Sequence, residues 1–237
     1  MEYPLPKKIT PNPLLSSTVE IRFSSELSSD EVFSKLYPKF SKELPKLETR
    51  RLPKDKNQDQ KHLAEYILTG KGYQIFLDND VIAFENIGEY HLWDNYLPFI
   101  KNNIEILSDS GIVKSIDRIG LRYISFFEIT ERLSNVLNIE INTPFESYRQ
   151  SNDFFRTQLY KGDTTILLHL LQNAEIQKDD KIYNGILIDI DASQTEDLPN
   201  LIDNRLIDII ENLHSEEKLL FFSLLKKSFI EKLNPQY

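Results

Sequence analysis

IVKSIDRIGLRYISFF, residues 112–127, is the stretch on which the fold depends. It is rich in β-branched and aromatic residues, contains no proline and is longer than a typical strand. Because side chains alternate between the two faces of a strand, the charged residues and the glycine share one face. That face carries Lys114, Arg118, Gly120 and Arg122. We therefore expect a long central strand that joins two parts of the chain.

The elements around this strand are runs of strands separated by helices. Apolar periodicity predicts a helix from Asp30, a helix over 89–109 and a helical pair over 199–233, with Ser215 beginning its second member. The predicted strands are 17–24, 62–69, 72–78, 81–87, 153–161, 164–173 and 183–192. Such an order is typical of an α+β fold, with antiparallel sheets flanked by helices in two similar halves.

Two domains follow from this division. Residues 1–127 form an N-terminal α+β half that ends with the central strand. Residues 128–237 form a β-meander followed by the helical pair.

Composition excludes several classes of protein. The chain has 237 residues, no cysteine and only 7 glycines, so it offers no disulfide framework, no thiolate nucleophile and little material for a phosphate-binding loop. It contains no apolar run of about 20 residues and no apolar core of a secretory signal near its start. We expect a cytoplasmic protein with no cofactor and no membrane partner.

Charge is unevenly distributed along the chain. The net charge is −9, and residues 71–237 alone carry −11. An acidic body disfavours a dedicated nucleic-acid-binding protein, since neutralisation of phosphates dominates such binding. The polar stretch 45–61 is the exception and looks like an exposed basic loop. Its cations Arg50, Arg51, Lys54 and Lys56 are candidate nucleic-acid contacts, although a solvated loop is the more frequent explanation for such a stretch.

Catalytic motifs are scarce. The four histidines, His62, His91, His169 and His214, are not at metal-ligand spacing, so we expect no metal site from them. The best catalytic candidates are Asp189 and Asp191, which share one strand face and resemble carboxylates that hold Mg²⁺ in nucleases.

Structural pairing is the competing interpretation of those two aspartates. Arg118 and Arg122, candidate binding residues themselves, provide partners for Asp189 and Asp191 on a neighbouring strand, and Glu20 provides another carboxylate. We regard these charges as more in keeping with structure than with catalysis.

The last helical segment is apolar on most of its faces. A helix of this kind lies at the centre of its own domain or docks on a partner. Candidate interface residues are Leu220, Phe221, Leu224 and Phe229.

Four motifs together resemble a family of uncharacterised bacterial proteins with a sporadic genomic distribution. They are PNPLLSSTVEIRF (11–23), RIGLRYISFF (118–127), GILIDIDAS (185–193), and NLHSEEKLLFFSLL (212–225) with the LNPQY tail (233–237). The resemblance implies a gene in a mobile or defence-associated neighbourhood, and hence a role in phage defence or in a pair of the toxin–antitoxin type. It implies no active site.

These observations predict a non-catalytic binding or regulatory protein that acts through a protein partner or through self-association. The alternatives are a metal-dependent nuclease or phosphodiesterase that uses Asp189 and Asp191, and an accessory protein that contacts nucleic acid.

Overall fold

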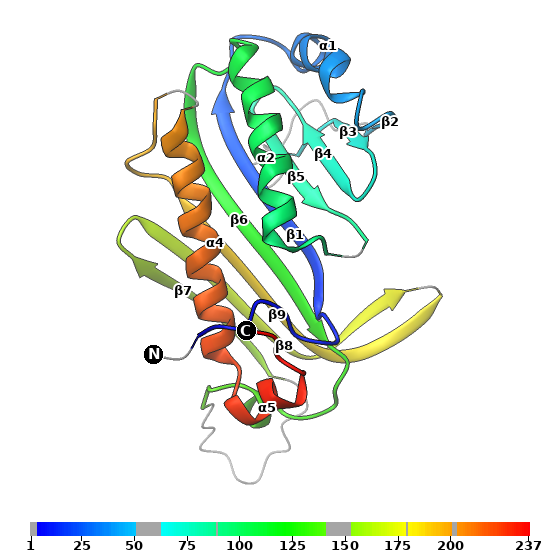
Figure 1. Cartoon of the computed structure of the whole chain (residues 1–237), viewed down its shortest axis with the longest axis vertical. Helices are drawn as coiled ribbons and strands as arrows, with labels where there is room; N and C mark the ends of the chain where they lie inside the picture. Colours follow the sequence, from blue (N-terminus) through cyan, green and yellow to red (C-terminus); the bar gives the residue numbers. More distant parts are fainter. Residues whose placement is uncertain (1–3, 51–62, 89, 141–152, 179, 201–202) are drawn as a thin grey trace.

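The computed structural model describes residues 4–50, 63–88, 90–140, 153–178, 180–200 and 203–237. In this part of the chain nine strands form one antiparallel sheet in the order β2-β3-β4-β5-β1-β6-β9-β8-β7 (Figure 1). The strands are β1 Leu14–Ser24, β2 Lys46–Thr49, β3 Tyr66–Thr69, β4 Tyr73–Leu77, β5 Val81–Asn86, β6 Ser115–Phe127, β7 Phe154–Lys161, β8 Thr164–Lys178 and β9 Lys181–Gln194. The helices are α1 Ser29–Phe40, α2 Leu92–Asp109, α3 Leu133–Val136, α4 Asn204–Leu224 and α5 Lys227–Lys232. The fold is mixed α+β.

The stretch quoted first forms β6, next to the middle of the sheet. On one side β6 pairs with β1, with Ile119 opposite Ile21, and on the other with β9, with Tyr123 opposite Ile190. Residues on both sides of position 127 therefore contribute strands to the same sheet.

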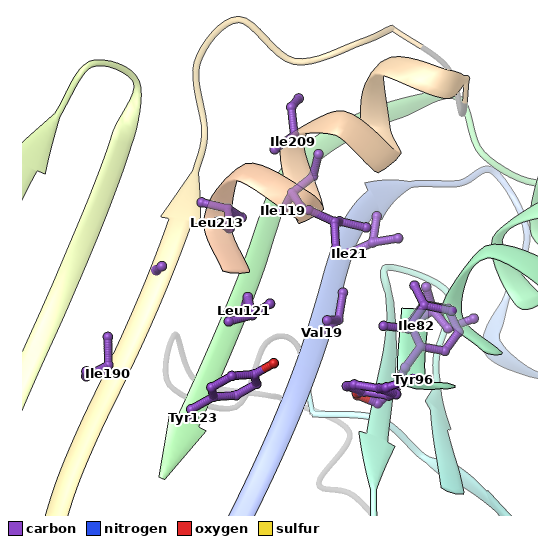
Figure 2. Packing of buried hydrophobic residues seen from close by; sticks show 14 of the residues in the cluster. Val19, Ile21, Ile82, Tyr96, Ile119, Leu121, Tyr123, Ile190, Ile209 and Leu213 are labelled. Carbon is purple, nitrogen blue, oxygen red and sulfur yellow. The ribbon is translucent and has the colours of Figure 1, made fainter. Parts of the chain in front are cut away.

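One face of the sheet is buried and the other is open. In β1 the alternation is strict, with Val19, Ile21 and Phe23 buried and the residues between them half-buried. The long helices α2 and α4 cover the buried face (Figure 1). Figure 2 shows side chains from β1, β6 and α4 meeting there, with Tyr96 of α2 nearby. Burial of this apolar surface stabilises the sheet, at about 25 cal/mol per Å².

Two details of the elements differ from what the sequence predicts. Helix α4 runs without a break through Ser215, whose hydroxyl donates to the Glu211 carbonyl oxygen (2.9 Å) instead of capping a new helix. A short edge strand, β2, occupies part of the predicted loop 45–61.

The N-terminal arm is held by the end of the chain. The amide of Thr10 donates to the carbonyl oxygen of Leu233 (2.7 Å), and Lys8 and Gln236 form a β-bridge. The arm therefore crosses α4 near one end of this helix (Figure 1). Among the described residues, no helix is long and apolar enough to cross a membrane.

Candidate functional site

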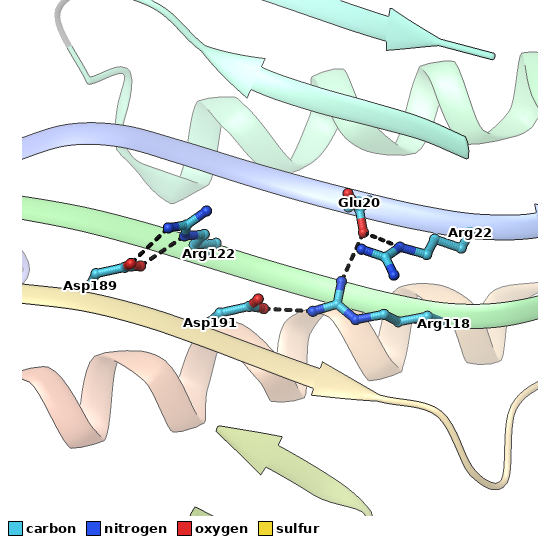
Figure 3. Close-up of polar contacts among 6 residues, drawn as sticks. All are labelled: Glu20, Arg22, Arg118, Arg122, Asp189 and Asp191. Carbon is cyan, nitrogen blue, oxygen red and sulfur yellow. Dashed lines mark hydrogen bonds and ion pairs between the residues drawn. The ribbon is translucent and has the colours of Figure 1, made fainter. Parts of the chain in front are cut away.

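Charged side chains form a ladder on the open face of the sheet (Figure 3). Arg118 of β6 donates to Glu20 of β1 (2.9 Å) and to Asp191 of β9 (2.7 Å). Arg22 donates to the same Glu20 oxygen (2.7 Å). The Arg118 guanidinium therefore connects three neighbouring strands through charge-assisted hydrogen bonds.

The second arginine of β6, Arg122, forms a bidentate contact with a carboxylate. The Nε and one terminal nitrogen of Arg122 donate to the two carboxylate oxygens of Asp189, at 2.8 and 2.7 Å. Nδ1 of His169 lies 3.4 Å from the same carboxylate. The Asp189 side chain is only 8% exposed, and its hydrogen bonds raise the pKa of Arg122 above its ordinary value.

Gly120 makes room for this ladder. A Cβ atom at Gly120 would lie 2.2 Å from a terminal nitrogen of Arg118, so the guanidinium lies over the glycine and reaches both neighbouring strands. The RIGLR pattern in β6 thus has a structural explanation. Asp189 and Asp191 are bound to guanidinium groups, and no group of three His, Asp or Glu side chains placed to hold a metal ion occurs within the residues described.

The remaining predicted binding residues lie elsewhere. Arg50 is exposed, and its guanidinium carbon lies 5.4 Å from the ring centroid of Phe76. Arg51, Lys54 and Lys56 lie outside the described residues.

The predicted interface residues belong mostly to the interior of this chain. Phe221, Leu224 and Phe229 are buried, and Leu220 is half-buried. Phe229 packs edge-on against Phe127 of β6, with ring centroids 5.2 Å apart. Packing within the chain therefore accounts for much of the apolar surface of this segment, and a partner contact there stays a prediction.

A pocket opens between the N-terminal arm, the start of α2, β6 and α4. Its volume is about 200 Å³. Part of its wall is aromatic, formed by Tyr90, Trp93, Tyr123, Phe221 and Phe222.

Hydrogen bonds connect three side chains along this wall. The hydroxyl groups of Tyr90 and Tyr123 lie 3.2 Å apart, and the Tyr123 hydroxyl lies 3.0 Å from Nδ1 of His214. Trp93 stacks on the His214 ring with centroids 3.9 Å apart. Burial, together with nearby Lys218, lowers the pKa of His214 to about 4, and burial raises the pKa of Tyr90 to about 12. Both groups are therefore neutral near pH 7.

Glu217 is the most unusual residue of the pocket. It comes from the buried side of α4 and is 3% exposed. No residue that the structure describes forms a hydrogen bond or ion pair with its carboxyl group. Burial raises the pKa of Glu217 to about 8, so near pH 7 its carboxyl group is mainly neutral and can donate a hydrogen bond.

Sequence reasoning missed this pocket. It considered His214 only as one of four histidines without metal-ligand spacing and did not consider Glu217. A signal existed, because Glu217 lies four residues after Leu213 and four before Phe221, within the apolar stripe of α4. The closure of the pocket by the arm had no such signal.

Strand β7 is a second unusual surface, at one edge of the sheet. Its large apolar side chains Phe154, Phe155, Leu159 and Tyr160 are between 36% and 73% exposed. Its one pairing among the described strands is with β8.

In comparisons with known proteins, no family model and no curated sequence matches the chain. The family resemblance of the four sequence motifs therefore stays a prediction.

Proposed function

We propose that this chain is a non-catalytic binding or regulatory protein that acts through a protein partner, with β7 as the contact surface. The observation that supports this most is the exposure of four large apolar side chains on an edge strand. Such edges are usually short, charged or covered, because unpaired backbone groups invite another strand to add. Strand addition also orders a partner through main-chain hydrogen bonds, with side-chain contacts providing specificity.

Charge favours a foreign partner over a second copy. Strand β7 contains Arg156 and Lys161 and no acidic residue, although the chain as a whole carries −9. Lys161 is already paired with Glu216 of α4 (2.7 Å), whereas Arg156 has no carboxylate partner among the described residues. Pairing of two β7 strands would therefore add two unpaired guanidinium groups to one small sheet edge, which costs free energy. We therefore infer that the occupant is an extended, acidic segment of another protein. Self-association is the competing outcome.

The test compares two variants in size-exclusion chromatography with light scattering and in capture from the native host. Phe154→Ser combined with Tyr160→Ser removes the most exposed apolar groups of β7, which are 66% and 73% exposed. Ile182→Ser, at a site 65% exposed on β9, is the matched control. We expect the protein to be a monomer. The partner that it captures, once purified, should bind the wild type and the Ile182→Ser control but not the β7 double variant.

Two results would count against the proposal. Binding of the purified partner that survives the β7 double variant would place the contact elsewhere. A dimer that dissociates in the double variant would replace the foreign partner with a second copy.

The setting of this function is also a proposal. We infer a cytoplasmic, bacterial protein, and the motif resemblance supports a component of a defence system or of a toxin–antitoxin pair. The neighbouring genes test this idea, since an adjacent effector gene supports it and a metabolic operon opposes it.

We also infer that the two halves of the chain are similar in arrangement. In support, β1 and β6 lie side by side, and β5-β4-β3 and β9-β8-β7 extend outward from them in matching order. A long helix, α2 or α4, follows each meander. Superposition of the two halves tests this, and β1 with β5-β4-β3 failing to superpose on β6 with β9-β8-β7 would refute it.

A further inference from the structure

We propose that the pocket between the N-terminal arm and α4 binds a small, single-ring organic anion that carries a hydrogen-bond acceptor on its apolar body. Nothing in the proposed protein contact at β7 requires this site. The inference stands on the cavity, on the buried carboxyl group that faces it and on the charges around its mouth.

The size of the cavity limits the ligand. At about 200 Å³ it is smaller than the roughly 300–1,000 Å³ pockets that take drug-sized molecules. Its aromatic wall, formed by Tyr90, Trp93, Tyr123 and Phe222, favours a flat apolar body that can stack. A molecule with one ring meets both conditions.

The carboxyl group of Glu217 favours a ligand with a hydrogen-bond acceptor. Glu217 lines the cavity, and no described residue bonds to its carboxyl group. A ligand atom that accepts a hydrogen bond from this carboxyl group would supply the partner that the described residues do not. Because the acid is neutral near pH 7, the complementary group is a carbonyl oxygen or a ring nitrogen.

The exposed end of the pocket favours an anion. Lys7 and Lys8 of the arm are exposed, Lys218 of α4 is half-buried, and all three line the pocket. Asp94 at the start of α2 is the opposing carboxylate, so three cations face one anion. The chain as a whole has a net charge of −9, but the charge around this pocket is positive. A positive local charge attracts a carboxylate or sulfonate group.

A cation in an aromatic cage is the competing ligand, because aromatic faces and a carboxylate also bind amines. The three lysines oppose it. Glu217 would also have to ionise in a buried position.

The experiment uses four probes and the only tryptophan of the chain. Trp93 lies in the pocket wall, so its fluorescence reports occupancy without a label. The probes are 4-acetylbenzoate, 4-ethylbenzoate without the acceptor, 4-acetylbenzamide without the charge, and 4-acetylbenzylamine with the opposite charge. Affinities are measured by fluorescence titration and calorimetry on the full chain at pH 7.

We expect 4-acetylbenzoate to bind most tightly, on the order of tenfold more tightly than each of the other three probes, as one hydrogen bond or one charge contact implies. The lysine variant Lys7→Gln with Lys8→Gln changes exposed side chains only. It should bring the affinities for 4-acetylbenzoate and 4-acetylbenzamide together.

Glu217→Gln keeps a hydrogen-bond donor at position 217 but removes the group that ionises. Its amide donates at any pH, so binding of 4-acetylbenzoate should be independent of pH. In the wild type, binding should weaken as the pH rises through about 8 and Glu217 ionises. The ionisable groups lining the pocket around Glu217 are Lys7, Lys8, Tyr90, Asp94, Tyr123, His214 and Lys218.

Three results would overturn the proposal. These are tighter binding of 4-acetylbenzylamine, equal binding of the acetyl and ethyl benzoates, and no saturable response of Trp93 to any probe at millimolar concentration.

Discussion

Replacing Glu217 by glutamine should stabilise the protein, and the gain should grow as the pH rises. In the unfolded chain Glu217 ionises around its ordinary pKa of 4.5, whereas burial raises its pKa in the folded protein to about 8. Between these values the folded state holds a proton that the unfolded state has released. The free energy of unfolding therefore falls as the pH increases.

The magnitude follows from about 1.4 kcal/mol for each pKa unit. At pH 7 the buried acid lowers the stability by roughly 3 kcal/mol, and above pH 8 by roughly 5 kcal/mol. Glu217→Gln removes this penalty, because the carboxamide has nearly the same shape as the neutral acid and does not ionise. For a domain of this size, 3 kcal/mol corresponds to an increase in Tm of roughly 6–12 °C.

The assay is chemical or thermal denaturation of wild type and variant at several pH values from 5 to 8, with unfolding monitored by circular dichroism. His214, whose pKa is lowered to about 4, is present in both chains, so its titration cancels in the difference. Glu211→Gln is the control on the same helix. Glu211 is half-exposed in an ion pair with Lys101 (3.0 Å), so its replacement should cost about 1 kcal/mol or less.

A difference between Glu217→Gln and wild type that stays constant from pH 5 to pH 8 would refute the reasoning. It would mean that Glu217 does not hold a proton in the folded protein.

Three further substitutions test the packing and the charge ladder by denaturation. Gly185→Ala should cost more than 2 kcal/mol, because its Cβ would lie 2.1 Å from the backbone oxygen of Phe127; a cost below 1 kcal/mol would contradict this contact. Asp189→Asn should cost about 1–3 kcal/mol by leaving Arg122 without its charged partner, and an unchanged stability would show that the ladder contributes little. Tyr96→Phe should cost about 1 kcal/mol, since the buried hydroxyl donates to a carbonyl oxygen at 2.5 Å; no loss would argue against that bond.

Local patterns predicted the strands well. The predicted strand 112–127 differs from β6 by three residues at its start, because β-branched and aromatic side chains mark the whole run. The pairing of Arg118 with Asp191 and Glu20 also followed from alternation, once these residues were assigned to strands that share a sheet.

The order of strands was beyond local patterns. Periodicity indicates which side chains face inward, but it does not identify the neighbouring strand. The placement of β1 between β5 and β6 depends on contacts between residues far apart in the sequence. The pocket was unpredictable for the same reason, since its wall joins the arm at Lys7 to α4 at Glu217.

The position of β1 also governs the order in which the chain can fold. Thr18 of β1 pairs with Glu85 of β5 and with Arg122 of β6, so the two edges of this strand find partners at different times during synthesis. Until the ribosome has released β6, an early β1–β5 sheet keeps one apolar, unpaired edge open to other chains. Pairings at such long sequence separation also slow folding. Fragments that end before β6 should therefore aggregate, and a fragment that stops at residue 127 still lacks β9, the strand that pairs with the other edge of β6.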